Sequence, residues 1–463
     1  KGPRRCNHTC IMKKIYKMSK RMFSVSHRGP KPNYGISPTE VIRTVLLNGI
    51  GVAAAKTYGG HIGACTIMFQ AGSRHEMNEA LGACHFVRAA SSSSSCAYSG
   101  FTKMRSIAQQ GVSITCTGDR QSIAYTLRCP TTSFAETKCY LLDTALRCSF
   151  KQWEIDNLKP MLKDDLHRIH PLQRVLDLAQ KACWAGPLTN SLFCDSSRIY
   201  EMTGETLNKF TNENFKADHC SVASVGIPYE ETIKLAEAIE PRRERPLSRM
   251  LVKSWPRAGF EFYDLGPDSD TWICVVVPGC GTYDLTELLK HSIIAHACGT
   301  DNIQEGTHTT MDRMPEPPIG LMPLGDLHTT YKTFNIAYYE TGVFGVVAKT
   351  RACSARNVAK SAAQFLAHVG NLDSKQINAG KKRLQVSLAL HEEDCVQLSE
   401  GLALQAVNRF CIDNAKAAIN MIDSISNDDI KHTAMSLSSK GHQMAYAVVG
   451  DIGQVPHDID IRP

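Results

Sequence analysis

The sequence predicts an α+β fold of two homologous domains, each a helix-flanked mixed β-sheet, joined by a linker. Three observations support this fold class: the length of 463 residues, the ordinary share of 43% hydrophobic and 21% charged residues, and a pattern of helices and strands that occurs twice. A chain of this length holds about two or three domains and can bury a sizeable core. The composition excludes a disordered, collagen-like or coiled-coil protein.

The repeat appears as matched residues about 222 positions apart. Three residues of one predicted helix recur in order in the second half of the chain: Ile155, Lys159 and Leu162, then Ile377, Lys381 and Leu384. Helix starts at Thr203 and Ser426 are matched in the same way, and an apolar strand follows each of them, at 220–227 and 444–449. This period is far too long for a solenoid of short repeats, so two homologous domains explain it best.

Strands are predicted where short apolar or alternating runs lie between turn residues. These runs are 41–47, 64–70, 112–116, 123–128, 260–264, 272–277 and 343–348. A helix is predicted from Ser354 to Val369, because Val358 and Ala362 follow helical spacing and Gly370 provides a C-terminal stop.

The domain boundaries follow from breaks in this pattern. We predict an N-terminal domain at 36–240, a linker at 241–252 and a C-terminal domain at 253–463. The stretch from Glu240 to Pro246 is charged, contains two prolines and has no apolar periodicity, which is typical of a linker. Residues 1–35 are predicted to form a mitochondrial presequence and a flexible N-terminus.

The N-terminal segment carries the excess of positive over negative charge. Residues 1–39 contain ten of the 52 Lys and Arg and none of the 45 Asp and Glu, so the net charge of +7 does not indicate a nucleic-acid-binding surface. Apolar residues recur at helical spacing from Ile11 to Met22, which is typical of a transit peptide. Arg21, Phe23 and Ser24 match a cleavage pattern of matrix presequences. A solvated basic tail or a membrane-surface helix is the alternative.

Several other functional classes lack support in the sequence. The 18 cysteines are scattered without a C-x-x-C pair, so we expect free thiols in a reducing compartment. We find no apolar run near the roughly 18 residues that a transmembrane helix needs. No P-loop or dinucleotide-binding motif follows a strand, and the histidine pairs His167/His170 and His291/His296 lack a metal-binding pattern, so we expect them to be structural.

Two stretches resemble the pitrilysin-type peptidases of mitochondria. They are TVLLNG at 44–49 and FQAGSRHE at 69–76, within halves of about 220 residues. Active members of that family carry H-x-x-E-H on the next helix, where two histidines bind zinc and the glutamate polarises the attacking water. A more distant glutamate is their third ligand.

The corresponding positions here are His85, Arg88 and Ala89. A guanidinium can neither accept a proton nor bind a cation, and alanine has no donor atom. The distal position falls near 163–165, which reads Lys-Asp-Asp, and the alignment there is ambiguous by a residue or two. The resemblance therefore implies an inactive zinc-peptidase homologue with no catalytic residue, no metal ligand and no cofactor, and with His85 as an ordinary helix residue.

Four stretches further resemble the core subunits of ubiquinol-cytochrome c reductase, respiratory complex III. These stretches are 85–92, 152–160, 190–199 and 334–345. The resemblance implies a structural subunit, peripheral to the matrix side of the mitochondrial inner membrane. Its partners would be core protein 1, cytochrome b, cytochrome c1 and the Rieske subunit, with no nucleic acid.

Two alternatives remain open from the sequence. The alpha subunit of the mitochondrial processing peptidase also lacks zinc ligands, but it carries a long glycine-rich loop that grips presequences. Residues 298–310 contain only Gly299 and Gly306 at the corresponding place, which favours the core subunit. An active metallopeptidase with unrecognised ligands is the other alternative.

Overall fold

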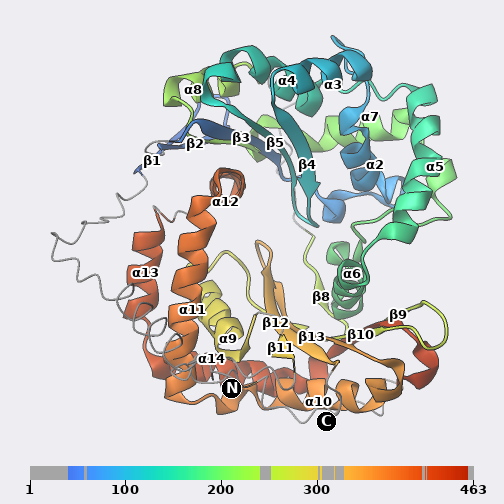
Figure 1. Cartoon of the computed structure of the whole chain (residues 1–463), viewed down its shortest axis with the longest axis vertical. Coiled ribbons are helices and arrows are strands. Elements are labelled where there is room, and N and C mark those ends of the chain that lie inside the picture. The colour runs from blue at the N-terminus through green and yellow to red at the C-terminus, as the bar shows by residue number, and fades with distance from the viewer. Residues whose placement is uncertain are drawn as a thin grey trace, which may run out of the picture. The chain divides into compact units, whose positions relative to one another are not determined.

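The computed structural model describes residues 40–56, 60–239, 252–300, 303–304, 318, 328–408, 412 and 414–456. These residues form two six-stranded sheets, a two-stranded ribbon and the helices around them (Figure 1). Within this part of the chain, we find no helix that combines the length and the apolar character needed to cross a membrane.

The first sheet has the strand order β1-β2-β7-β3-β5-β4. Its strands are β1 (Glu40–Val45), β2 (Gly51–Lys56), β3 (Ile62–Phe69), β4 (Ser113–Gly118), β5 (Ile123–Pro130) and β7 (Cys220–Val225). Strands β2 and β7 are parallel, and the other neighbouring pairs are antiparallel.

The second sheet has the order β11-β12-β13-β10-β14-β9. Its strands are β9 (Phe260–Asp264), β10 (Thr271–Pro278), β11 (Ile303–Gln304), β12 (Thr330–Ala337), β13 (Gly342–Thr350) and β14 (Ala445–Gly450). Strands β9 and β14 are parallel and all other pairs are antiparallel. The run β9-β14-β10-β13-β12 therefore has the same chain order and strand directions as β2-β7-β3-β5-β4, which supports two homologous halves.

The helices follow the same duplicated order. In the first half they are α2 (Ala83–Ala89), α3 (Gly100–Gln109), α4 (Phe134–Leu146), α5 (Gln152–Arg168), α6 (Pro171–Cys183), α7 (Gly204–Asn214) and α8 (Tyr229–Glu237). In the second half they are α9 (Leu285–Cys298), α10 (Ala355–Ala367), α11 (Ser374–Glu393), α12 (Cys395–Asn408), α13 (Ala415–Ser424) and α14 (Asn427–Ser439). A ribbon of β6 (Trp184–Ala185) and β8 (Trp255–Pro256) connects the two halves.

Both faces of each central sheet are buried, which explains why the strands read as continuous apolar runs. Along β10, Ile273 and Val275 enter one core with α9, α10, α11 and α14, whereas Cys274 and Val276 enter a second core on the other face. Strand β7 is buried at every residue for the same reason.

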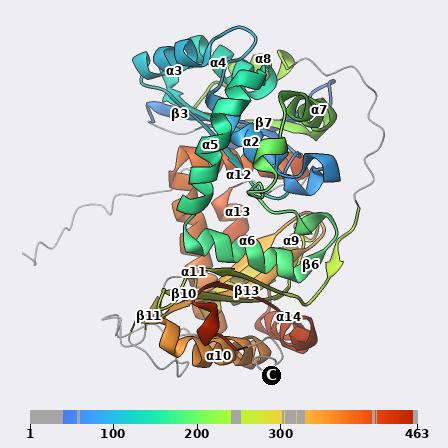
Figure 2. The ribbon, with the colours of Figure 1, turned by 90° about the vertical axis from the view of Figure 1, so that its right-hand side faces the viewer.

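Each half covers one face of the other half's sheet with a helix. Helix α6 packs against β10 and β14 of the second sheet, and α12 packs against β2, β3 and β7 of the first (Figures 1 and 2). Small side chains such as Ala53 and Ala223 line the face that receives Leu402 and Ala403 of α12. The two helices begin 224 residues apart, so their exchange is itself part of the repeat.

The predicted strands and the 354–369 helix are confirmed, with ends shifted by one to a few residues. Thr203 and Ser426 are both N-caps whose side chains accept a backbone N–H bond, at the starts of α7 and α14. Strand β12 was not predicted. The proposed cleavage residues Arg21, Phe23 and Ser24 and the linker residues 241–251 lie outside the described residues, so the domain boundaries stay predictions.

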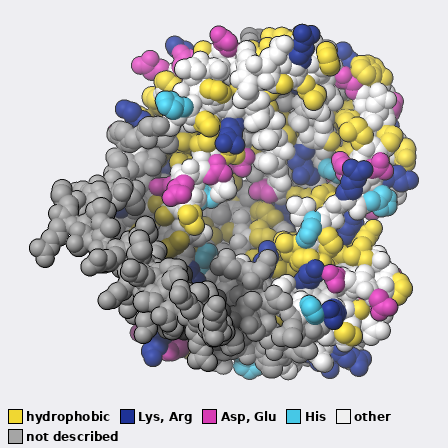
Figure 3. Space-filling model, in the orientation of Figure 1, with side chains coloured by type: hydrophobic (Ala, Val, Ile, Leu, Met, Phe, Trp, Pro, Cys, Tyr) yellow, Lys and Arg dark blue, Asp and Glu magenta, His cyan; other side chains and the backbone are white. Residues whose placement is uncertain are grey.

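Figure 3 shows acidic and basic side chains interspersed over the described part of one face. Within that part, we see no broad field of a single sign. This distribution agrees with the sequence, in which the charge excess lies in residues 1–39.

Candidate functional site

Helix α2 carries the altered peptidase motif, and Glu76 fixes its first turn. The Glu76 carboxylate accepts hydrogen bonds from the backbone N–H groups of Gly82 (2.9 Å) and Cys84 (2.7 Å), which have no partner within the helix. Burial raises the pKa of Glu76 to about 7. Gly82 has φ 94°, and a Cβ there would lie 2.4 Å from Sγ of Cys194, so this turn requires glycine.

His85 contacts a loop rather than a second ligand. Its Nδ1 accepts a 3.2 Å hydrogen bond from the backbone N–H of Cys194, and its ring lies edge-on to Phe193 at 5.7 Å between centroids. Burial, assisted by the nearby Arg88 charge, lowers the pKa of His85 to about 4. The imidazole is therefore neutral near pH 7 and acts as a hydrogen-bond acceptor.

Arg88 binds the same loop. Its guanidinium donates to the carbonyl oxygen of Leu192 (2.5 Å) and, more weakly, to that of Cys84 (3.4 Å). Ala89 follows on the helix and offers only a methyl group. Both polar residues of the altered motif thus hold the backbone of residues 192–194, so α2 positions a loop instead of presenting a base to water.

The distal motif position lies near the C-terminal end of α5. Lys163, Asp164 and Asp165 are all exposed there, and Lys163 lines a cavity described below. Over the described ranges, no group of three or more His, Cys, Asp and Glu side chains is placed to hold a metal ion. That His85, Arg88 and Ala89 form an inactive remnant of a zinc site stays a prediction.

Three of the four other histidines considered as ligands have bonds within or next to their own helices, and the fourth, His167, lines the cavity described below. Nδ1 of His291 lies 2.8 Å from the carbonyl oxygen of Glu287, and Nδ1 of His296 lies 2.8 Å from that of Ser292. His170 caps α6, because its Nδ1 accepts from the N–H of Leu172. These contacts support structural roles.

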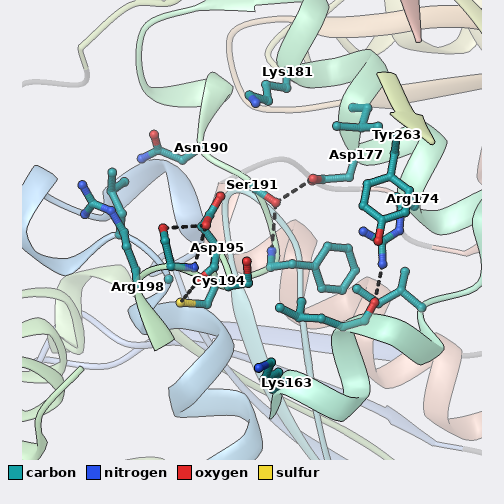
Figure 4. A pocket seen from close by; sticks show the side chains of 18 of the residues that line it. Lys163, Arg174, Asp177, Lys181, Asn190, Ser191, Cys194, Asp195, Arg198 and Tyr263 are labelled. Atoms are coloured by element: carbon teal, nitrogen blue, oxygen red, sulfur yellow. Dashed lines mark hydrogen bonds between the residues drawn. The ribbon is translucent and has the colours of Figure 1, made fainter. Parts of the chain in front are cut away.

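A cavity of about 580 Å³ lies beside the motif, with the loop at 190–198 as one wall (Figure 4). Its other walls are the C-terminal end of α5, helix α6, Tyr263 of β9 and the segment just before α2. Sequence reasoning missed this cavity, although it used residues 190–199 for the family resemblance.

A buried ion pair supports that loop. Arg120 donates to Oδ1 of Asp177 at 2.7 Å, and the two side chains are 0% and 6% exposed. Asp177 also accepts from Oγ of Ser191 (2.6 Å) and from the N–H of Leu192 (3.1 Å). The sequence held a signal for this ion pair: Asp177 lies on the apolar face of the amphipathic α6, and a buried carboxylate requires a partner.

Of the segment compared with the glycine-rich loop, Cys298, Gly299 and Thr300 belong to the described chain. Residues 301–302 and 305–310 lie outside the described residues. Gly299 has φ 118° and ends α9. The comparison of glycine content with the processing peptidase therefore stays a prediction from sequence.

Known proteins match both the fold and the length of this chain. Residues 51–196 match the family model "Insulinase (Peptidase family M16)". The human cytochrome b-c1 complex subunit 2 is 25% identical over 90% of this chain and 91% of the human protein. The mitochondrial-processing peptidase subunit alpha of Solanum tuberosum is 22% identical over 92% of this chain and 85% of its own length.

A solved chain of complex III2 from Candida albicans superposes with a TM-score of 0.75 at 14% identity, covering 91% of this chain and 98% of that one. The structural match confirms the peptidase-like fold, and at 14% identity it supports nothing beyond the fold. The sequence similarity to the b-c1 subunit confirms the resemblance to the complex III core subunits.

Proposed function

We propose that this chain is core subunit 2 of ubiquinol-cytochrome c reductase, a non-catalytic subunit that supports assembly and stability of the complex. The observation that carries the proposal is the similarity to cytochrome b-c1 complex subunit 2, which extends over 90% of this chain and 91% of the human relative. A match of this extent leaves little of either chain unaccounted for, so it concerns the whole subunit rather than one shared domain.

The chemistry on α2 supports a structural role. A zinc peptidase needs three protein ligands, an open metal position and a base that polarises water. Arg88 stands at the position of the base and donates to the carbonyl of Leu192, and Ala89 stands at the position of the second histidine. We infer that this helix has exchanged catalysis for support of a loop.

We place the subunit on the matrix side of the mitochondrial inner membrane, as a peripheral component. Its partners in this proposal are core protein 1, cytochrome b, cytochrome c1 and the Rieske subunit. A peptidase-type shell suits this role because it keeps large, rigid domain faces for protein contacts after its chemistry is lost.

The second candidate is an alpha-type, presequence-binding subunit of the mitochondrial processing peptidase. The full-length similarity to the Solanum tuberosum alpha subunit favours it, at 22% identity. The identity to the human b-c1 subunit is 25%, and we therefore rank the core subunit first.

Native gel electrophoresis of mildly solubilised mitochondrial membranes separates the candidates. The band that contains this chain would be cut out and its proteins identified by mass spectrometry. We expect cytochrome b, cytochrome c1 and the Rieske subunit in that band. A small heterodimer with a zinc-bearing peptidase subunit would replace the proposal with the second candidate, and stoichiometric zinc on this chain with chelator-sensitive cleavage would establish an active peptidase.

A further inference from the structure

The cavity between α5, α6 and the 190–198 loop is lined by charged side chains. Most of its carboxylate oxygens already accept hydrogen bonds, whereas several of its cationic donors have no partner among the described residues. The cavity lies within the described residues and borders the altered zinc motif, because Lys163 on its wall stands near the distal ligand position. What this cavity binds is a different question from the assembly role proposed above. Its volume of about 580 Å³ is in the usual range for a ligand site.

The carboxylates of the cavity wall already have partners. Asp177 is paired with Arg120 and accepts from Ser191 and Leu192. Oδ1 of Asp195 accepts from the N–H and the hydroxyl of Ser197, at 2.9 Å and 2.7 Å.

The third carboxylate of the wall, Glu76, uses both of its oxygens on the first turn of α2. Glu76 and Asp177 therefore have little capacity left to bind a cationic ligand, whereas the exposed Asp195 keeps Oδ2 without a hydrogen bond among the described residues.

The cationic side chains keep donors free. Lys163 is exposed and makes no hydrogen bond or ion pair with the described residues. Arg198 donates one bond, to the carbonyl oxygen of Asn78 at 2.8 Å, out of the five that a guanidinium can make.

On α6, Lys181 has a partly exposed pair with Glu261 at 3.1 Å. Arg174 donates to the carbonyl of Leu166 and lies 3.9 Å from the ring centre of Tyr263. The unfilled hydrogen-bonding capacity of the wall thus consists mainly of positively charged donors, which match anionic oxygens.

The distribution of these cations indicates the kind of anion. In Figure 4, Lys163 and Lys181 lie on opposite sides of the 190–198 loop, and Arg198, which belongs to that loop, lies across the view from Arg174. A single phosphate requires donors that converge on one point, whereas these donors are spread around the cavity. Leu81, Leu166 and other apolar side chains also line the cavity.

We propose that this cavity binds an acidic peptide segment of a partner protein, with carboxylates at the dispersed cations and apolar side chains between them. A basic presequence would meet the same cations with its own positive charges and is disfavoured, because like charges repel.

The test uses the purified full-length chain and two fluorescent ten-residue peptides, one alternating Leu and Glu and the other alternating Leu and Lys. Binding is followed by fluorescence anisotropy at low salt and again at 0.5 M salt. The variant Lys163→Glu reverses a cavity charge, and Lys375→Glu is its control, since Lys375 is exposed on α11 and does not line the cavity.

We expect saturable 1:1 binding of the Glu peptide, weakened by salt, and at least about tenfold weaker binding to Lys163→Glu, because a reversed charge removes an attraction and adds a repulsion. Lys375→Glu should stay within about twofold of the unchanged protein. Equal binding of the Lys peptide, or equal losses in both variants, would overturn the proposal. Displacement of the peptide by free succinate, with an inhibition constant equal to the peptide's dissociation constant, would also overturn it. The site would then bind a small carboxylate rather than a peptide.

Discussion

Two helical glycines of the second half should respond to alanine in opposite directions. Gly380 lies inside α11 and Gly401 inside α12. Alanine is favoured over glycine in a helix interior by about 1 kcal/mol, so propensity alone predicts that both substitutions stabilise the protein. The surroundings of the two positions decide otherwise.

A Cβ at Gly380 would overlap the neighbouring helix α9. It would lie 2.7 Å from Cβ of Ala297, 2.8 Å from the N of Ala297 and 2.8 Å from the carbonyl oxygen of Ile293. Carbon atoms pack best at about 3.5–4.0 Å, and backbone atoms cannot turn away as a side chain could. Overpacking costs about 1–3 kcal/mol, and three contacts under 3.0 Å place Gly380→Ala in the upper part of this range, at about 2–3 kcal/mol. After the gain in propensity of about 1 kcal/mol, the variant should lose about 1–2 kcal/mol.

Gly401 has room for a methyl group. The nearest atom to its added Cβ would be Nε2 of His391 at 3.5 Å, which is an ordinary contact. Gly401→Ala should therefore stabilise the chain by about 0.5–1 kcal/mol. Urea unfolding followed by circular dichroism measures both changes, provided that the slope of the transition is the same in all three proteins. A neutral or stabilised Gly380→Ala would refute the close approach of α9 and α11, and a destabilised Gly401→Ala would refute the use of propensity.

Three further predictions concern the altered motif and the loop beside it. Arg120→Met should lower the free energy of unfolding by about 3–5 kcal/mol, because it leaves Asp177 buried without its cation, and adding Asp177→Asn should recover part of this loss in the same urea assay. His85→Gln tests the neutral imidazole: the difference in the free energy of unfolding between the unchanged protein and this variant should shrink by on the order of 2 kcal/mol as the pH falls from 6.5 toward 4. The reason is that His85 stays neutral in the folded protein, while the imidazole of the unfolded chain takes up a proton over that pH range. A difference that is constant with pH would contradict the burial of a neutral ring. The double variant Arg88→Glu with Ala89→His should show no zinc-dependent peptidase activity in a fluorogenic peptide assay, and measurable turnover lost on chelation would contradict this.

Much of the fold was predictable because burial on both faces leaves a clear pattern in the sequence. Ile155 and Leu162 on α5, and Ile377 and Leu384 on α11, are buried at matched positions, so the repeat was visible as apolar residues at one offset. Strand β12 escaped prediction because its sequence is neither a continuous apolar run nor a strict alternation, since the polar residues Lys332 and Thr333 are adjacent.

The packing of α6 on the second sheet and of α12 on the first was not predictable, because it depends on the three-dimensional course of the chain. An amphipathic pattern specifies that a helix has a buried face, but it does not say which sheet covers that face. Small residues on the receiving strands, such as Ala53 and Ala223, give a signal only once the sheet order is known.

The motif positions were predictable from the family spacing, but their new contacts were not. The sequence identifies His85 and Arg88 on one helix, yet both of their loop partners are backbone groups, at Cys194 and Leu192. Every residue supplies a backbone carbonyl and every residue except proline supplies a backbone N–H, so no side-chain pattern marks the partner. Only the course of the chain from α6 back to α2 brings the two segments together.

These contacts also explain why restoring two residues should leave the site inactive. Glutamate at position 88 has no donor for the carbonyl of Leu192. Burial raises the pKa of Glu76, and the new negative charge would replace the guanidinium that now partly opposes this rise. Two carboxylates near each other favour uptake of a proton over ionisation of both. Histidine at position 89 would add at most a second imidazole to His85, while the region of the third ligand holds Lys163 beside exposed aspartates. The loop that α2 now supports would lose a bond, and a three-ligand zinc site would still be incomplete.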